Sequence, residues 1–297
     1  MKTIFIGNYK GGVGKTTSVL LLGKHLESKG KKVLLMDLDP QSSLSEICVR
    51  KCGRSLTDLN PNQTLNYVFD LSIENIRKGY NLDIEFNLTH LINEYEPNLD
   101  YIASSLYYEH DLGLDEINMN MEKDIRFFSI LAKLIDKIKR VKDYDYILID
   151  CPPNSSIITQ SAFMLSDYYL IPTIVDSISS QGIMHYIGTI SKVYSRYCEK
   201  HEDRLLFQHC FGNEPQLLGI FYTLIRGQVD YGDIVQKMQT ELQAMDRVQD
   251  IYIFENFTNN YVDITRGIAA DDPDSIPASK DTYDEIAGEL LARIAEL

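Results

Sequence analysis

The sequence lacks any run approaching the roughly 20 apolar residues that a membrane-spanning helix requires, and it contains no tryptophan. The opening residues 1–7 are too short and too abruptly ended for a secretory signal peptide. Five cysteines form no CxxC pair, and six histidines show no HExxH spacing. These absences indicate neither a disulfide framework nor a zinc site, and they favour a cytoplasmic protein without a membrane anchor.

Basic residues are also scarce, since 29 Lys and Arg stand against 43 Asp and Glu, for a net charge of −14. Residues 1–150 carry a net charge of −3, and residues 151–297 carry −11. A general electrostatic attraction to nucleic acid is therefore excluded, although a local patch could still bind phosphates. One such patch is the stretch 123–142, with 7 basic and 2 acidic residues, although runs of this kind are usually a solvated helix face.

The remaining composition is that of a globular domain, with 44% hydrophobic and 24% charged residues. Short apolar runs alternate with helix-length amphipathic stretches, which predicts an α/β fold with a doubly wound, mostly parallel sheet and helices on both faces. The expected strands are 2–8, 32–38, 144–150, 168–175 and 217–225. The expected helices are 16–28, 125–142, 157–166, 181–201, 234–245 and 280–297. Residues 50–100 show no clean period and are interpreted as an elaboration of a single domain over 1–297.

A glycine-rich loop, KGGVGKTT at 10–17, lies between the first expected strand and the first expected helix. Glycines let backbone N–H groups surround phosphate oxygens, and the N-terminus of the following helix adds partial positive charge. Lys15 can reach the β and γ phosphates of a nucleotide, and Thr16 can coordinate Mg²⁺. The ordinary GxxxxGK[ST] pattern is altered, because Tyr9 stands at its first glycine position and an additional lysine is present at Lys10. The residues expected to bind the nucleotide are Lys10, Gly11, Gly12, Val13, Gly14, Lys15, Thr16 and Thr17.

Two of the expected strands end in acidic residues. Asp150 follows the apolar run 147–149, and Asp37 and Asp39 close the second strand within the segment DLDPQ. The carboxyl ends of parallel strands meet at one edge of the sheet, where ligands bind in folds of this class. Asp150 therefore fits a carboxylate that assists Mg²⁺, and DLDPQ places carboxylates where an attacking water could be held.

The segments KGGVGKTT, DLDPQ and LIDCPP, in this order and spacing, resemble the ParA/MinD group of deviant Walker A ATPases, and within it the Soj-like chromosome and plasmid partition branch. These motifs lie within residues 10–153, and weaker similarity continues through 171–172, 181–182 and 218–219. The resemblance implies a P-loop NTPase fold, Mg²⁺-dependent ATP hydrolysis and an ATP-dependent homodimer. It also implies a ParB-type centromere-binding partner that activates the ATPase.

The resemblance further implies roles for individual residues. Lys10 would be the signature lysine that reaches the phosphate bound by the partner subunit, whereas residues 15–17 would hold the phosphates and Mg²⁺ in their own subunit. Asp39 would orient the attacking water, and Asp150 would assist the metal. The expected catalytic residues are thus Lys10, Lys15 and Asp39. The expected metal-binding residues are Thr16 and Asp150.

Binding to DNA is the family property that the composition supports least. Many partition ATPases contact DNA non-specifically through basic residues of the C-terminal half, and here that half is strongly acidic. The residues of this half that are expected to contact DNA are Arg226, Arg247 and Arg266.

Two other functions remain open from the sequence. A membrane- or cargo-positioning ATPase of the MinD type would need a basic amphipathic helix at the C-terminus, but the polar face of 282–294 is acidic. An ATP-dependent metabolic synthetase that shares the deviant loop would couple ATP turnover to a small substrate instead.

Overall fold

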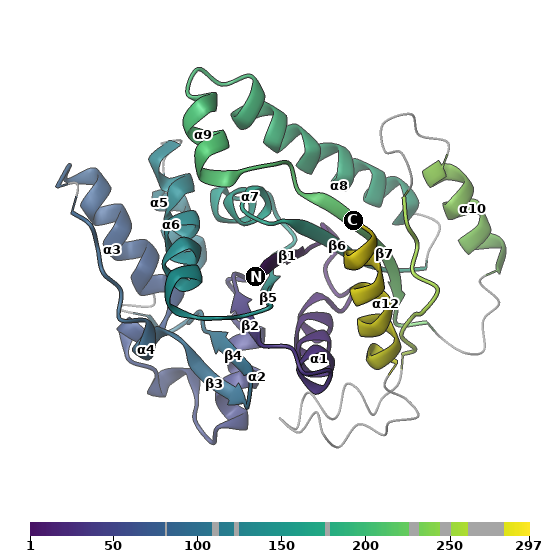
Figure 1. Ribbon diagram of the computed structural model, residues 1–297, viewed down its shortest axis with the longest axis horizontal. Helices are drawn as coiled ribbons and strands as arrows, with labels where there is room; N and C mark the ends of the chain where they lie inside the picture. Colours follow the sequence, from purple (N-terminus) through teal and green to yellow (C-terminus); the bar gives the residue numbers. More distant parts are fainter. Residues whose placement is uncertain are drawn as a thin grey trace.

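The computed structural model describes residues 1–80, 82–108, 113–121, 125–175, 179–225, 232–243, 251–260 and 282–297. Their strands are β1 Lys2–Ile6, β2 Val33–Asp37, β3 Asn93–Glu96, β4 Leu99–Ile102, β5 Tyr146–Asp150, β6 Tyr168–Ile174 and β7 Gln216–Thr223. They form one sheet in the order β3-β4-β2-β5-β1-β6-β7 (Figure 1). Neighbouring strands are parallel, except that β3 runs antiparallel to β4 at one edge.

Helices cover both faces of this sheet. They are α1 Lys15–Ser28, α2 Ser43–Lys51, α3 Leu65–Arg77, α4 Leu88–Leu91, α5 Leu114–Asn120, α6 Ile125–Val141, α7 Ile157–Met164, α8 Ser179–Tyr194, α9 Arg204–Phe211, α10 Gly232–Gln243 and α12 Tyr283–Glu296. Two short 3₁₀ helices, η1 Leu56–Asp58 and η2 Pro61–Gln63, and one π-helical turn, η3 Ser195–Glu199, complete the described elements. No helix in these ranges is both long and apolar enough to span a bilayer.

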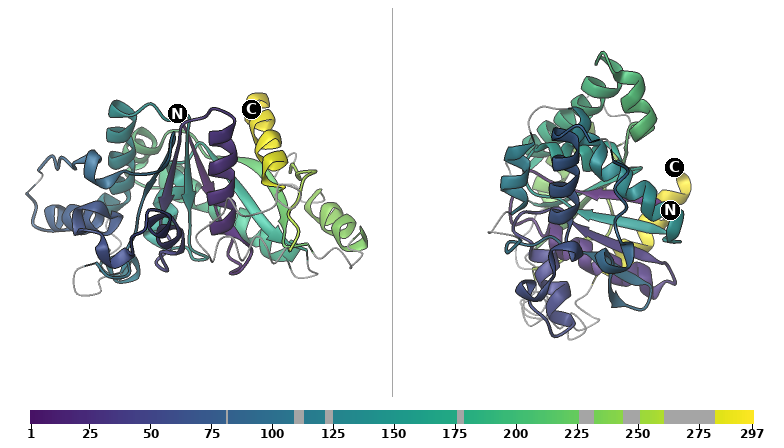
Figure 2. Two further views of the ribbon diagram at one scale, coloured as in Figure 1. Left: turned by 90° about the horizontal axis from the view of Figure 1, so that it is seen from below. Right: turned by 90° about the vertical axis from the view of Figure 1, so that its left-hand side faces the viewer.

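Alternate residues of the central strands point to opposite faces, as the two-residue period of a strand requires. Phe5 of β1 belongs to a buried cluster that includes residues of α3, α6, α7 and α8, whereas Ile4 and Ile6 belong to a second cluster with residues of α1, α2 and α12. Helices α1 and α12 lie side by side on this second face (Figures 1 and 2). The C-terminal helix therefore packs alongside the helix that follows the glycine-rich loop.

The predicted doubly wound α/β fold is confirmed. The five expected strands correspond to β1, β2, β5, β6 and β7, and the expected helices correspond to α1, α6, α7, α8, α10 and α12, with boundaries that differ by a few residues. The helix expected over 181–201 is divided, because α8 ends at Tyr194 and η3 continues the chain to Glu199.

The region 50–100 supplies two strands of the main sheet and helix α3. Leu65, Val68, Phe69 and Ile73 are buried in α3, at the spacing of one helix face, so this helix had a periodic signal that the sequence interpretation missed. Strand β3 was hidden for another reason. Its sequence is NEYE, and Tyr95 is its one fully buried residue, so the edge strand carries almost no apolar pattern.

Candidate nucleotide-binding site

The glycine-rich loop joins β1 to α1 at the carboxyl edge of the sheet, where the ends of β1, β2 and β5 lie in register. Gly12 and Gly14 have φ values of 72° and 77°, in the left-handed region that favours glycine. Gly14 is the N-cap of α1, and its carbonyl accepts the first helical hydrogen bond from the N–H of Ser18 at 2.9 Å. The N–H groups of the first helical turn are consequently left facing the loop, which is the geometry of an anion site.

Two polar side chains outside the motif link the loop to other strands of the sheet. The Asn8 side-chain N–H₂ donates to the carbonyl of Pro172 in β6 at 2.9 Å, and its Oδ1 accepts from the Lys10 N–H at 3.0 Å. The Thr223 hydroxyl, at the end of β7, lies 2.9 Å from the Val13 carbonyl and 3.1 Å from the Thr173 carbonyl, two acceptors that share its one hydrogen. The sequence interpretation missed both residues, although their positions at strand ends were a usable signal.

Lys15 lies inside the loop, with a relative exposure of 7%. Its Nζ donates to the carbonyl of Lys10 at 3.3 Å. Burial lowers the pKa of this ammonium group, and the carboxylates of Asp150 and Asp39 act in the opposite direction. The charge of Lys15 is therefore held at the base of the loop among acidic residues, where a phosphate group would compete for it.

Thr16 and Asp150 connect the loop to the end of β5. The Thr16 hydroxyl donates to Oδ2 of Asp150 at 2.7 Å, and Asp150 is fully buried. Its other oxygen, Oδ1, is buried with no hydrogen-bond partner among the described residues. Burial, followed by the charge of Asp37, raises the pKa of Asp150 well above its usual range. A hydroxyl and an unsatisfied carboxylate oxygen at a phosphate loop fit Mg²⁺. This ion binds oxygen ligands, and the protein usually supplies only one or two of them.

The two aspartates of DLDPQ have different environments. Asp37 is 1% exposed and accepts hydrogen bonds from the N–H of Asp39 at 3.0 Å and from Ser45, through N–H at 2.8 Å and hydroxyl at 2.6 Å. Burial outweighs these donors and raises the pKa of Asp37 to about 6. Asp39 is half-buried, and its Oδ1 accepts from the N–H of Gln41 at 2.9 Å. Asp37 thus fastens α2 to β2, and Asp39 is left as the accessible carboxylate.

The structure therefore brings the expected residues of the loop, Asp39 and Asp150 to one edge of the sheet. A family model described as an AAA domain matches residues 1–202, more than half of the chain. The chromosome-partitioning ATPase Soj of Treponema pallidum is 27% identical over 98% of this chain and 98% of its own. The chain belongs to the ParA-type family of partition ATPases.

Other similarities of this ParA-type chain differ in how much of each protein they cover. An uncharacterised Mycobacterium tuberculosis protein is 32% identical over 66% of this chain, but the match spans only about half, 54%, of that longer relative. Two solved structures share the fold at 20% identity. A Mycobacterium smegmatis cobyrinic acid a,c-diamide synthase with bound ATP analogue and magnesium has a TM-score of 0.68, covering 99% of this chain and 96% of that one. A putative plasmid partition protein of Borrelia burgdorferi bound to AMPPNP has a TM-score of 0.64, covering 99% and 98%.

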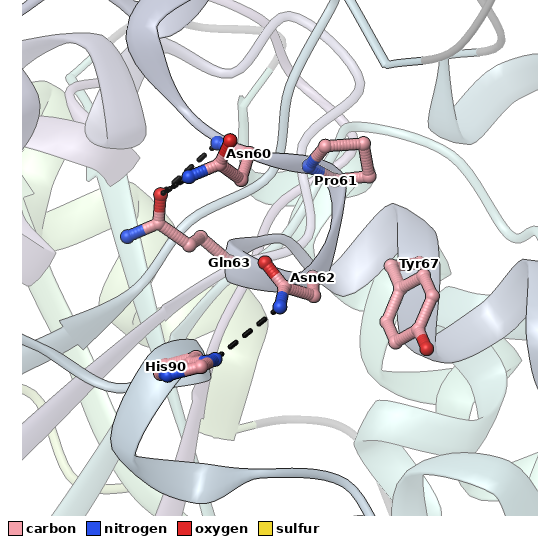
Figure 3. A pocket seen from close by; sticks show the side chains of 6 residues that line it. All are labelled: Asn60, Pro61, Asn62, Gln63, Tyr67 and His90. Carbon is pink, nitrogen blue, oxygen red and sulfur yellow. Dashed lines mark hydrogen bonds between the residues drawn. The ribbon is translucent and has the colours of Figure 1, made fainter.

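Cavities of the ParA-type chain also occur away from the phosphate loop. One of about 430 Å³, shown in Figure 3, is lined by η2 with Asn60 before it, by Tyr67 of α3 and by His90 of α4. There the side-chain N–H₂ of Asn62 and Nδ1 of His90 are 3.3 Å apart. Another, of about 390 Å³, lies between α3, α6 and the segment 82–86. No residue of the phosphate loop lines either cavity.

The basic residues considered for DNA contact fall into two groups. In the run on α6, Lys137 is 3.4 Å from Asp83, and Arg140 pairs with Asp136. These ion pairs reduce the positive charge that this helix offers to phosphates. Arg226, Arg247 and Arg266 lie outside the described residues, so they stay a prediction from the sequence.

Proposed function

We propose that this protein binds Mg·ATP at residues 10–17, dimerises around the nucleotide, and hydrolyses it to ADP and phosphate in a cycle that positions or segregates plasmid or chromosomal DNA. The observation that carries the proposal is the pairing of Thr16 with a buried Asp150 whose second oxygen has no hydrogen-bond partner among the described residues. A divalent cation bound beside a phosphate would give this second oxygen of Asp150 the partner it lacks among the described residues. The names of the partition relatives support the cellular role.

The residues of the site divide the chemistry between them. The N–H groups at the start of α1 and the ammonium group of Lys15 bind the phosphates and stabilise the charge that develops on them during transfer. Thr16 and Asp150 would hold Mg²⁺, which neutralises phosphate charge when bound. Asp39, the accessible aspartate of DLDPQ, orients the attacking water.

Lys10 is the residue on which the proposed ATP-dependent dimer depends. The backbone of Lys10 is fixed on both sides, since its N–H donates to Asn8 and its carbonyl accepts from Lys15. Lys15 already supplies a cation to the phosphates of its own subunit, so a second lysine at the entrance of the loop is suited to the nucleotide of another subunit. A ParB-type partner would then act on the ATP-bound dimer.

Lys10→Ala should retain nucleotide binding and lose the ATP-dependent dimer. The change removes one charge from the interface and leaves the backbone bonds of the loop in place. Light scattering with Mg·ATP should give a monomer mass for the variant where the parent protein gives a dimer mass.

Lys2→Ala is the matched control, because Lys2 begins β1 at the opposite edge of the sheet, where it lies 3.7 Å from Asp167. It should dimerise as the parent does. Unchanged dimerisation and turnover in Lys10→Ala would refute the role of Lys10 across the interface.

The DNA step of the proposal is tested by a salt titration. Anisotropy of a labelled duplex is measured with ATP, with ADP and without nucleotide at several salt concentrations. We expect binding with ATP alone and strong weakening by salt, because a chain of net charge −14 can hold DNA only through close phosphate pairs. Replacing Arg226 and Arg266 by alanine should lower the slope of log affinity against log salt by roughly two.

The same titration separates the alternatives. If the ATP-bound dimer fails to bind DNA at low salt, a protein cargo replaces DNA as the scaffold. A membrane scaffold of the MinD type is disfavoured, because Ile286, Ala287 and Leu290 on the apolar face of α12 are fully buried against the body of the protein. ATP turnover that depends on an added small substrate would favour the synthetase alternative.

A further inference from the structure

The C-terminal helix makes a buried polar contact with the helix that follows the phosphate loop. Tyr283, in the first turn of α12, is 2% exposed, and its hydroxyl lies 3.0 Å from the hydroxyl of Ser18 in α1. Ser18 is itself fully buried. Two hydroxyl groups 265 positions apart in the sequence therefore meet at the first turn of α1, directly after the loop.

The direction of this hydrogen bond follows from the other contact of Ser18. The Ser18 hydroxyl lies 2.7 Å from the carbonyl of Gly14, which can only accept, so Ser18 donates its hydrogen there. The hydroxyl of Tyr283 must then be the donor to Ser18. The result is a chain of donors, Tyr283 to Ser18 to Gly14, and each bond in such a chain polarises the next.

The end of this chain adds a second hydrogen bond to one peptide group of the loop, because the Gly14 carbonyl also accepts from the N–H of Ser18 at 2.9 Å. The carbonyl of Gly14 and the N–H of Lys15 belong to the same planar, trans peptide unit, so an anchored carbonyl also sets where that N–H points. The N–H of Lys15 is one of the N-terminal groups of α1 that face the loop. Gly14 has φ of 77° and no Cβ to restrict its rotation, so the anchoring has to come from the hydrogen bonds.

Tyr283 is held firmly enough to act in this way. The hydroxyl of its neighbour Thr282 donates to the carbonyl of Phe257 at 2.8 Å. On the other side, Asp284 is 2.5 Å from Nζ of Lys29 and 3.5 Å from His25, both near the C-terminal end of α1. The hydrogen bond from Lys29 lowers the pKa of Asp284, so this contact favours the charged carboxylate. The start of α12 is thus fastened to α1 and to the segment 251–260.

We propose that Tyr283 is a positioning residue for the nucleotide site, and that its hydroxyl, through Ser18 and the Gly14 carbonyl, aims the Lys15 N–H at the phosphates. This proposal rests on the proposed function, because it assumes that the loop binds a nucleotide. It assigns the C-terminal helix a part in phosphate binding without any contact to the ligand.

The test compares Tyr283→Phe with Tyr144→Phe by calorimetric titration with Mg·AMPPNP, well below the melting temperature. Tyr144 is also a buried tyrosine, 6% exposed, and its hydroxyl donates to Asp100, but it precedes β5 at the amino edge of the sheet. Both variants lose one hydrogen bond and should melt at a lower temperature. Only Tyr283→Phe should bind the nucleotide more weakly, by roughly 2- to 12-fold, the range for one neutral hydrogen bond.

A second measurement tests the route through Ser18. If the effect of Tyr283 passes through Ser18, the combined variant Ser18→Ala/Tyr283→Phe should bind no more weakly than Ser18→Ala alone. Effects that multiply would contradict that route. An unchanged affinity of Tyr283→Phe, beside a parent protein that binds AMPPNP, would overturn this proposal alone. A parent protein that does not bind AMPPNP would overturn the proposed function and this proposal with it.

Discussion

Lys15→Ala should abolish measurable Mg·ATP binding and ATP hydrolysis. Lys15 is 7% exposed, and its ammonium group donates to the Lys10 carbonyl inside the loop. Charge-assisted hydrogen bonds contribute about 1.5–3 kcal/mol each, so loss of contacts to two phosphates should weaken affinity by roughly 100-fold or more. Titration calorimetry with Mg·AMPPNP and a phosphate-release assay measure the two effects.

The matched control for this variant is Lys139→Ala, which removes an exposed lysine from α6. It should bind and hydrolyse ATP as the parent protein does. A thermal melt without nucleotide shows whether each variant is folded. Near-normal affinity in a folded Lys15→Ala protein would refute the assignment of the loop as the phosphate site.

Asp39→Ala should stop turnover and leave the nucleotide bound. Asp39 is half-buried at the same edge of the sheet, and under the proposed function the phosphates and metal would keep Lys15 and the pair Thr16 and Asp150 as partners. Loss of a group that orients or deprotonates a nucleophile typically costs 100- to 10,000-fold in rate. Hydrolysis should fall by roughly that factor, and an ATP-bound dimer should accumulate in size-exclusion chromatography with Mg·ATP.

Asp37→Ala provides the contrast, since it removes the other aspartate of DLDPQ. Its three hydrogen-bond donors, the N–H of Asp39 and two groups of Ser45, would lose their acceptor in the interior. The free energy of unfolding in urea should therefore decrease by about 1–3 kcal/mol, whereas Asp39→Ala should leave it nearly unchanged. If Asp39→Ala loses nucleotide binding as fully as turnover, Asp39 is a metal ligand or a structural residue instead.

The sequence predicted much of the fold, for a reason that differs between elements. The strands β2 and β5 were readable because they are buried on both faces and appear as continuous apolar runs. The edge strand β3 was not, because one inward residue, Tyr95, supplies its whole apolar signal. Helix α3 was missed despite a regular apolar face, since polar residues on either side obscured its ends.

By itself the sequence predicted the residues of the candidate nucleotide site. The spacing of KGGVGKTT is local, so it predicts a phosphate loop where a strand precedes it and a helix follows, and both elements are present as β1 and α1. Asp150 could be placed beside that loop because parallel strands end at a common edge. The tertiary structure alone decided which aspartate of DLDPQ is accessible, because Ser45 covers Asp37 only once α2 has packed on β2. It also brought Thr223 to Val13 of the loop and Tyr283 to Ser18 of α1, across 210 and 265 positions of sequence. Such contacts depend on how distant elements pack against one another, and no local pattern in the sequence encodes that packing.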